Sequence, residues 1–157
     1  MGEGNVSAAV ALAGERLDEG FLSASENVIT LPREARRVVL SEPTQNWAPA
    51  VLSQLEDHLR LPAGWDGHRA RQLKLETVLY AVRLLTAVCK PNTPAPSVVP
   101  TVSGGLQFEW HLQSIDLEIV VFAPTKVEFY ARDGKSELER ELSVDFRPLL
   151  PWIDRLS

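Results

Sequence analysis

Residues 106–132 alternate between apolar and polar side chains in consecutive short runs, and this pattern limits the fold more than any other feature. A period of two is typical of strands with one buried and one solvated face. Short turn sequences separate the runs, at Gly104-Gly105, Gln113-Ser114 and Asp133-Gly134. Such short connections favour hairpins between neighbouring strands. The pattern therefore predicts an antiparallel β-meander that starts near Val98.

Pairing the runs through these turns predicts which residues face each other. With Gln113-Ser114 as one loop and residues 122–126 as the next, the apolar positions fall on one side and form the core, built on Phe108, Trp110, Leu117, Ile119 and Phe129. Val121 meets Val127 on that side. The opposite face then pairs His111 with Asp116, Glu109 with Glu118, Glu118 with Tyr130, and Asp116 with Arg132.

Helical spacing appears on both sides of the predicted meander. A first helix has Asn46 as N-cap, Pro49 in its first turn and an apolar stripe of Val51, Leu52, Leu55 and Leu59. A second runs from about Arg71 to Cys89. A short last helix covers about residues 147–156, with Leu149, Leu150, Ile153 and Leu156 facing inward. Residues 136–142 fit either a strand or a helical turn. The fold class is α+β: two helices on a four- to five-stranded antiparallel meander, with a short C-terminal helix.

Residues 1–45 lack such periodicity and are expected to form a partly flexible N-terminal arm, leaving residues 46–157 as a single α+β domain. Within the arm, Ala8–Leu17 fits a short helix and Val28–Leu31 a strand ended by Pro32. Arg33, Arg36 and Arg37 form a basic cluster. The segment Ile29–Glu34 is similar to the strand of swapped-hairpin or ribbon-helix-helix antitoxins, although their further elements are not found at the required spacing. A transcriptional regulator acting through this arm is one alternative function.

Charge and composition narrow the classes of partner. The net charge is −5, from 16 Lys and Arg against 21 Asp and Glu. This balance disfavours nucleic acid and favours a basic protein partner, with a homo-oligomer left open. No run approaches the ~18 apolar residues that span a membrane, and Ala8–Ala13 is a poor signal peptide because no basic residue precedes it. The single cysteine, Cys89, is expected to be a buried apolar residue, and a cytoplasmic location fits.

No motif identifies a reaction. Nucleophile elbows, phosphate-binding glycine loops and dinucleotide fingerprints are absent, and His58, His68 and His111 show no metal-ligand spacing. We therefore assign no catalytic residue, metal or cofactor. A small hydrolase or nuclease that uses Glu109, Glu118 and His111 stays open as an alternative.

The outer face of the predicted sheet is the main candidate site. Carboxylates there are interleaved with apolar and aromatic groups, and the candidate contact residues are Glu109, Glu118, Glu128, Tyr130 and Phe122. Two interpretations compete. The carboxylates are either solvated and screened by water, or they await Lys or Arg from a partner. The second interpretation predicts a non-catalytic protein-interaction or accessory factor, antitoxin-like in character.

Trp65-Asp66-Gly67 is the most distinctive tripeptide. In the structural interpretation Trp65 fills the gap between the helices and the sheet, Asp66 caps loop donors, and Gly67 takes a left-handed conformation. In the functional interpretation Trp65, Asp66 and His68 line a binding groove.

Three segments together resemble a known group of proteins. The resemblance is to an uncharacterised family of small bacterial proteins with an LPxxWDG segment and a PTxxGGxxxEW hairpin. It is carried by Leu61-Pro62-Ala63-Gly64-Trp65-Asp66-Gly67, by residues 100–110 (PTVSGGLQFEW) after a helix, and by Asp116-Leu117-Glu118-Ile119. The similarity covers about residues 50–132. Members of that family often read Tyr-Gly-Ala after the WDG, whereas this chain has His68-Arg69-Ala70. The resemblance implies a compact bacterial protein from a mobile-element or toxin–antitoxin setting, and it carries over no activity.

Overall fold

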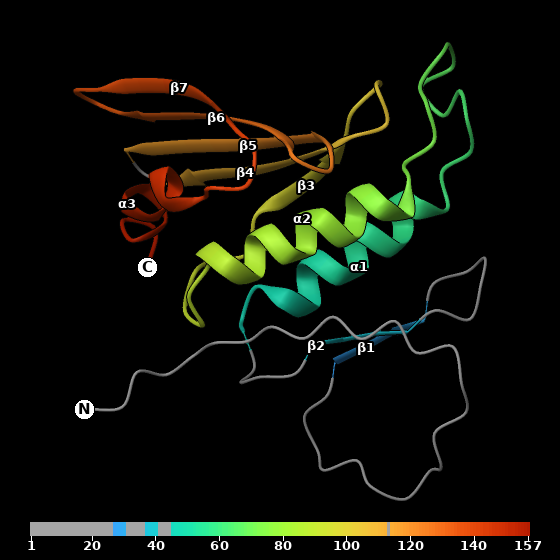
Figure 1. Ribbon diagram of the computed structural model, residues 1–157, viewed down its shortest axis with the longest axis horizontal. Coiled ribbons are helices and arrows are strands. Elements are labelled where there is room, and N and C mark those ends of the chain that lie inside the picture. Colours follow the sequence, from blue (N-terminus) through green and yellow to red (C-terminus); the bar gives the residue numbers. More distant parts are fainter. Residues whose placement is uncertain (1–26, 31–36, 41–44, 113) are drawn as a thin grey trace, which may run out of the picture.

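Helices cover one face of a five-stranded antiparallel sheet (Figure 1). The computed structural model describes residues 27–30, 37–40, 45–112 and 114–157. The strands follow chain order across the sheet: β3 (Ser97–Pro100), β4 (Leu106–Leu112), β5 (Ile115–Ala123), β6 (Lys126–Asp133) and β7 (Glu137–Leu142). The predicted α+β class and antiparallel meander are therefore confirmed.

The strand register agrees with the predicted pairing. Phe108 faces Ile119 and Trp110 faces Leu117 between β4 and β5. Between β5 and β6, Ile119 faces Phe129. The loop over residues 122–126 was predicted too long, since Ala123 pairs with Lys126 and only Pro124 and Thr125 connect the strands. A register irregularity between Val121 and Ala123 absorbs an extra residue and lets β5 continue.

Strand β7 resolves the ambiguity at residues 136–142. Asp133 starts the turn, and its carboxylate accepts hydrogen bonds from the backbone N–H of Lys135 and Ser136 at 2.9 and 2.8 Å. This turn sends the chain back along the free edge of β6, where Glu137–Leu142 pairs in antiparallel register. Pairing with that edge favours the strand, because it satisfies backbone groups that a single helical turn would leave open.

Two helices precede the sheet, α1 (Ala48–Leu59) and α2 (Leu75–Val88). Pro49 lies in the first turn of α1 as predicted. The predicted N-cap, Asn46, was wrong: the cap position is Trp47, and the Asn46 N–H donates to the carbonyl of Pro91. Helix α2 starts four residues later than predicted, because the Arg71 N–H donates to the Val102 carbonyl and holds this segment extended up to Lys74.

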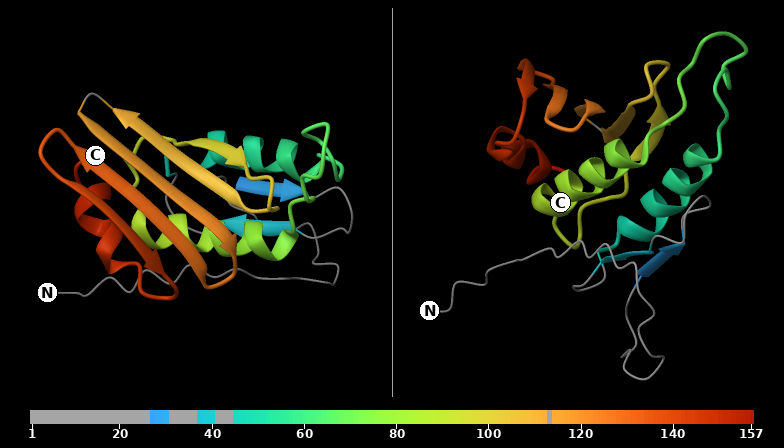
Figure 2. Two further views of the ribbon diagram at one scale, coloured as in Figure 1. Left: turned by 90° about the horizontal axis from the view of Figure 1, so that it is seen from above. Right: turned by 45° about the vertical axis from the view of Figure 1, so that its right-hand side comes forward.

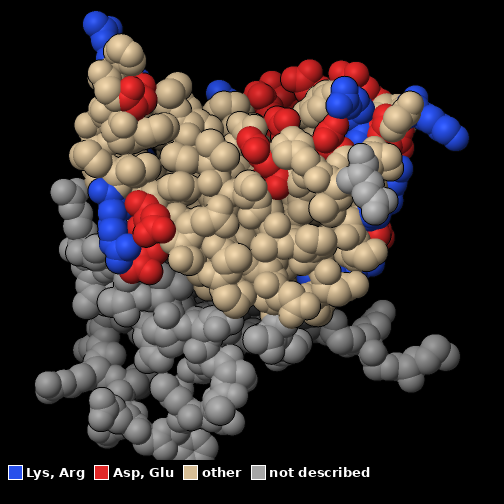
Figure 3. All heavy atoms as spheres, turned by 180° about the vertical axis from the view of Figure 1, so that it is seen from behind, with Lys and Arg blue, Asp and Glu red and all other residues tan. Residues whose placement is uncertain are grey.

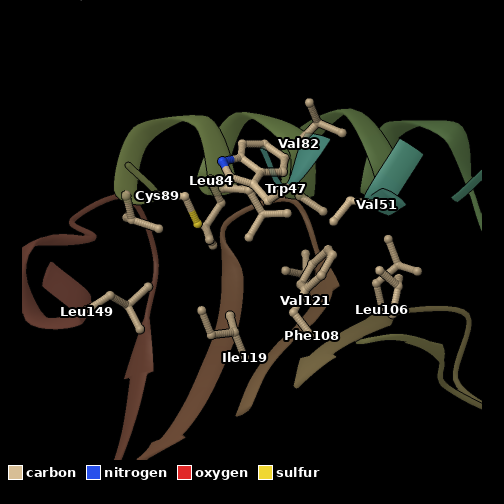
Figure 4. Close-up of a cluster of buried hydrophobic side chains, with 14 of the residues drawn as sticks. Trp47, Val51, Val82, Leu84, Cys89, Leu106, Phe108, Ile119, Val121 and Leu149 are labelled. Carbon is tan, nitrogen blue, oxygen red and sulfur yellow. The ribbon is translucent and has the colours of Figure 1, made fainter. Parts of the chain in front are cut away.

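The core lies between the helices and the inner face of the sheet (Figures 2 and 4). All of the predicted inner-face residues are buried, at 2% exposure or less: Phe108, Trp110, Leu117, Ile119 and Phe129. Trp47 is the tryptophan that fills the layer between helices and sheet, with 1% of its surface exposed. Trp65 is only half-buried and lies outside this cluster, so its predicted role as a core plug was wrong.

The chain ends in a short helical segment, a 3-10 turn η1 (Arg147–Leu149) followed by α3 (Leu150–Ile153). Leu149, Ile153 and Leu156 are buried as predicted, whereas Leu150 is 38% exposed and Trp152 is buried instead. The 3-10 turn has fewer residues per turn than an α-helix. This change of pitch rotates the apolar stripe away from the positions that a uniform helix predicts.

A second, two-stranded sheet pairs β1 (Asn27–Thr30) with β2 (Arg37–Leu40), and β1 contacts α1. The predicted first strand is present with slightly earlier bounds, and β2 was not predicted. The predicted helix at Ala8–Leu17 and the residues Arg33 and Arg36 lie outside the described residues. Among the helices that the structure describes, none is long and apolar enough to cross a membrane.

Candidate protein-interaction face

The outer face of the sheet points away from the helices (Figure 2). Register places carboxylates on four of its strands: Glu109, Asp116, Glu118, Glu128, Glu137, Glu139 and Glu141. We call these carboxylates, together with the neighbouring Val120 and Tyr130, the acidic face. No described helix covers it, and Figure 3 shows Asp and Glu side chains gathered along this side of the molecule.

Glu109 and Glu118 face each other directly on β4 and β5, as the sequence predicted. Like charges at such positions destabilise a strand pair by several tenths of a kcal/mol. The side-chain amide of Gln107 donates hydrogen bonds to both carboxylates, at 2.9 Å to Glu109 and 3.1 Å to Glu118. Because this amide is neutral, it orients the two carboxylates without cancelling their charge.

Next to this pair, three charged side chains form a row across β4, β5 and β6. His111 Nδ1 lies 3.1 Å from Asp116 Oδ1, and the Arg132 guanidinium donates to Asp116 Oδ2 at 2.6 Å. His111 Nε2 also lies 3.6 Å from Glu109. The hydrogen bond to Asp116 raises the pKa of His111 above its usual value of 6.5, and the same bond lowers the pKa of Asp116. Protonated His111 therefore reduces the negative charge of this face.

We expect Asp116→Asn to lower the pKa of His111 toward 6.5, because the strongest contact that favours the imidazolium is removed. The pH titration of the His111 ring protons by NMR measures this shift. In the parent chain the same contact adds stability below pH ~6.5, which is lost as the pH rises through the folded-state pKa. An unchanged His111 titration in the variant would contradict the His111–Asp116 contact.

Strand β7 adds carboxylates that the sequence interpretation missed. Glu139 faces Tyr130, Glu137 faces Arg132, and Glu141 faces Glu128. Glu128 and Glu141 also line a shallow groove of about 290 Å³ at the ends of β6 and β7. The alternation Glu137-Leu138-Glu139-Arg140-Glu141-Leu142 was the available signal, but the same leucine spacing also fits a helical turn.

Apolar and aromatic groups lie among these carboxylates. Tyr130 is half-buried, and burial and the nearby Glu137 raise its phenol pKa. Val120, beside Gln107 and Glu128, is also half-buried. Phe122 lies at the end of β5 in the irregular region, with the Lys126 ammonium 5.4 Å from its ring centre. The predicted contact residues of β4, β5 and β6 therefore share one surface, with Phe122 at its end.

The second candidate set, Trp65, Asp66 and His68, is separate from the acidic face and lies in the loop between α1 and α2. Asp66 caps this loop as predicted: its Oδ1 accepts the backbone N–H of His68 at 2.9 Å and of Ala70 at 3.0 Å. These bonds lower the pKa of its carboxyl. Gly67 has a positive φ of 80°, as its predicted left-handed conformation requires.

The remaining reactive side chains are in structural positions. Burial raises the pKa of Cys89 to about 12, so its thiol is protonated at neutral pH and is a poor nucleophile. His58 uses Nε2 to contact the Val98 carbonyl at 2.8 Å. Within the described part of the chain, no three His, Cys, Asp or Glu side chains converge as metal ligands would.

Comparison with known proteins gives no relative: no protein-family model, curated protein or solved structure matches this chain.

Proposed function

We propose that this protein is a non-catalytic interaction factor that binds a basic protein partner through the acidic face. The proposal is supported by the position of the unpaired carboxylates in the fold. Within the described chain, the Asp and Glu side chains that form neither an ion pair with a described basic side chain nor a backbone hydrogen bond, and that do not face a basic side chain, all belong to the acidic face: Glu118, Glu128, Glu139 and Glu141. Glu137, on the same face, is opposite Arg132.

Carboxylates elsewhere in the described chain are neutralised or bonded. Glu56 and Asp57 pair with Arg60, Glu76 with Lys74, and Asp154 with Lys90. Asp133 pairs with Arg155 and Asp145 with Arg147, and Asp66 accepts backbone donors. The concentration of unpaired negative charge on one open face is the pattern that electrostatic recognition of a basic surface requires.

The chemistry of the face suggests what the partner presents. Glu118 and Glu139 lie on either side of Tyr130 across β5, β6 and β7. A guanidinium or ammonium group over the Tyr130 ring would gain a cation–π contact and two ion pairs at once. Arginine and tyrosine are also common among the residues that dominate interface energies. We infer an antitoxin-like action in which covering a basic surface blocks its use.

The hydrolase alternative has less support. Glu109, Glu118 and His111 do lie together, but the groove at the ends of β6 and β7 is lined by Glu128 and Glu141 and by none of these three. The regulator alternative depends on the N-terminal arm, where Arg33 and Arg36 are outside the described residues. The strand that carries Arg37 belongs to the hairpin that contacts α1.

The proposal is tested with the double variant Glu109→Lys plus Glu118→Lys. We expect it to weaken binding of the partner isolated from the native host by at least about thirtyfold, since disrupting close interfacial charge pairs costs ~2 kcal/mol or more. Isothermal titration with the purified partner measures the loss.

The matched control is Glu76→Lys plus Asp154→Lys, which changes the net charge equally on the helical side of the molecule. It should leave the affinity within about twofold at physiological salt. The Debye length is then about 8 Å, so exposed charges farther than this from the acidic face are largely screened. Undiminished binding by the Glu109→Lys, Glu118→Lys variant would reject the acidic face as the binding site.

A further inference from the structure

The two segments that the sequence singles out meet at one end of the molecule. The Arg71 N–H donates to the Val102 carbonyl at 2.9 Å and ties the loop between α1 and α2 to the turn between β3 and β4. Both segments project together beyond the helices and the sheet (Figures 1 and 2). We call residues 61–72 and 101–105 together the tip.

Local bonds fix the tip in one conformation although it contributes little to the core. The Gly64 N–H donates to Ala70 and the Gly67 N–H donates to Gly64, at 2.8 and 2.9 Å. Gly104 has a φ of +87°, and a Cβ there would lie only 3.1 Å from the Gln72 carbonyl, so the two segments are in close contact. Rigid loops that project from a scaffold commonly carry binding residues.

The tip carries two arginines and one carboxylate, Asp66, so its net charge is positive where that of the acidic face is negative. Arg69 and Arg71 are exposed, and neither forms an ion pair with any described carboxylate. Val102 is 62% exposed, and Trp65 is half-buried outside the core. Tryptophan and arginine are enriched among interface hot spots.

We propose that the tip of one copy docks on the acidic face of a second copy, near Tyr130. This inference rests on the proposed function for the face and names one partner for it, the arginine-bearing tip of a second copy of the chain. The two surfaces have complementary charges: unpaired arginines lie on the projecting tip, and unpaired carboxylates lie on the open sheet. No described ion pair joins these two surfaces within one molecule.

A second copy suits the tip better than a nucleic acid does. The chain carries a net charge of −5, which repels phosphate backbones at long range, while the tip contributes only two unpaired arginines. Contact with a folded acidic surface needs no extended basic patch. Glu118 on β5 and Glu139 on β7 each lie one strand away from Tyr130, on opposite sides of it.

The test is a charge swap followed by sedimentation equilibrium of the full chain. Arg69→Glu plus Arg71→Glu should weaken self-association at least about tenfold, and so should Glu118→Lys plus Glu139→Lys. The chain that carries all four substitutions has an acidic tip and a basic patch on its face, and it should associate again. A 1:1 mixture of the two double variants should also recover association, which shows that each variant is folded.

Salt gives an independent readout, because raising it from about 0.1 M to about 1 M shortens the Debye length from about 10 Å to about 3 Å and should dissociate the assembly. A parent chain that stays monomeric at all concentrations, or double variants that associate as the parent does, would overturn the inference. The inference would also be overturned if the tip variants bound a nucleic acid less well than the parent chain while the mass of their assembly, measured by sedimentation, stayed that of the parent. The proposed function has a separate test: it fails if the Glu109→Lys, Glu118→Lys variant binds its foreign partner as tightly as the parent chain does.

Discussion

Replacing Trp47 with alanine is expected to lower the free energy of unfolding by about 3–5 kcal/mol, the range typical for truncating a buried aromatic side chain. Trp47 is 1% exposed and lies between the helices and the sheet (Figure 4). Its indole Nε1 donates to Gln45, a bond that is lost as well. Urea denaturation followed by circular dichroism measures the change, and a loss of this size is a large fraction of the stability of a small domain.

Trp65→Ala is the matched control, because it removes the same side chain from a half-buried position outside the core. We expect it to cost about 1 kcal/mol or less. Equal losses for the two variants would mean that Trp65 is a core residue after all, and the binding role of the tip would lose its motivation.

The sheet could be predicted in detail because the side-chain period of a strand is two. A slip of one residue would move Phe108, Trp110 and Ile119 from the core to solvent, so the apolar pattern admits a single register. The ends of the helices carry no comparable signal. Asn46 and Arg71 make backbone hydrogen bonds to residues distant in the sequence, at Pro91 and Val102, and these contacts decide where α1 and α2 begin.

The candidate site was predicted only in part, for a related reason. Glu109, Glu118 and Tyr130 follow from the register of the central strands, where alternation is strong. Strand β7 is an edge strand whose outer-face residues, including Glu139 and Glu141, are all acidic, and its leucine spacing suits two kinds of structure. Only pairing with β6 distinguishes them. The carboxylates that β7 adds to the acidic face therefore became visible only in three dimensions.

The two tryptophans also show that the local sequence does not predict which side chain is buried. Trp47 and Trp65 both lie next to turns and outside any periodic apolar run. The distinctive WDG tripeptide made Trp65 the expected core residue. Burial is decided by the path of the chain: Trp47 is held at the start of α1 against the core, while the loop of Trp65 is drawn outward to the turn between β3 and β4.

Gly105→Ala is expected to destabilise the protein by about 3 kcal/mol, the upper end of the cost of overpacking. A Cβ at this position would lie 2.5 Å from the carbonyl oxygen of Val121 and 3.1 Å from the Cα of Phe122. Both are backbone atoms of β5, which cannot move away without disturbing the sheet. Gly105 also donates its N–H to Thr101 Oγ1 at 2.8 Å, so it cannot shift alone.

Gly134→Ala supplies the control, since a Cβ there meets nothing within 4 Å and its φ is not positive. This variant should be neutral or more stable by about 0.4–1 kcal/mol, because alanine reduces the freedom of the unfolded chain. Urea denaturation of both variants gives the comparison. An unchanged free energy of unfolding for Gly105→Ala would show that β4 and β5 are less closely packed at this point. The assignment of residues to the acidic face, which depends on the register of these strands, would then be wrong.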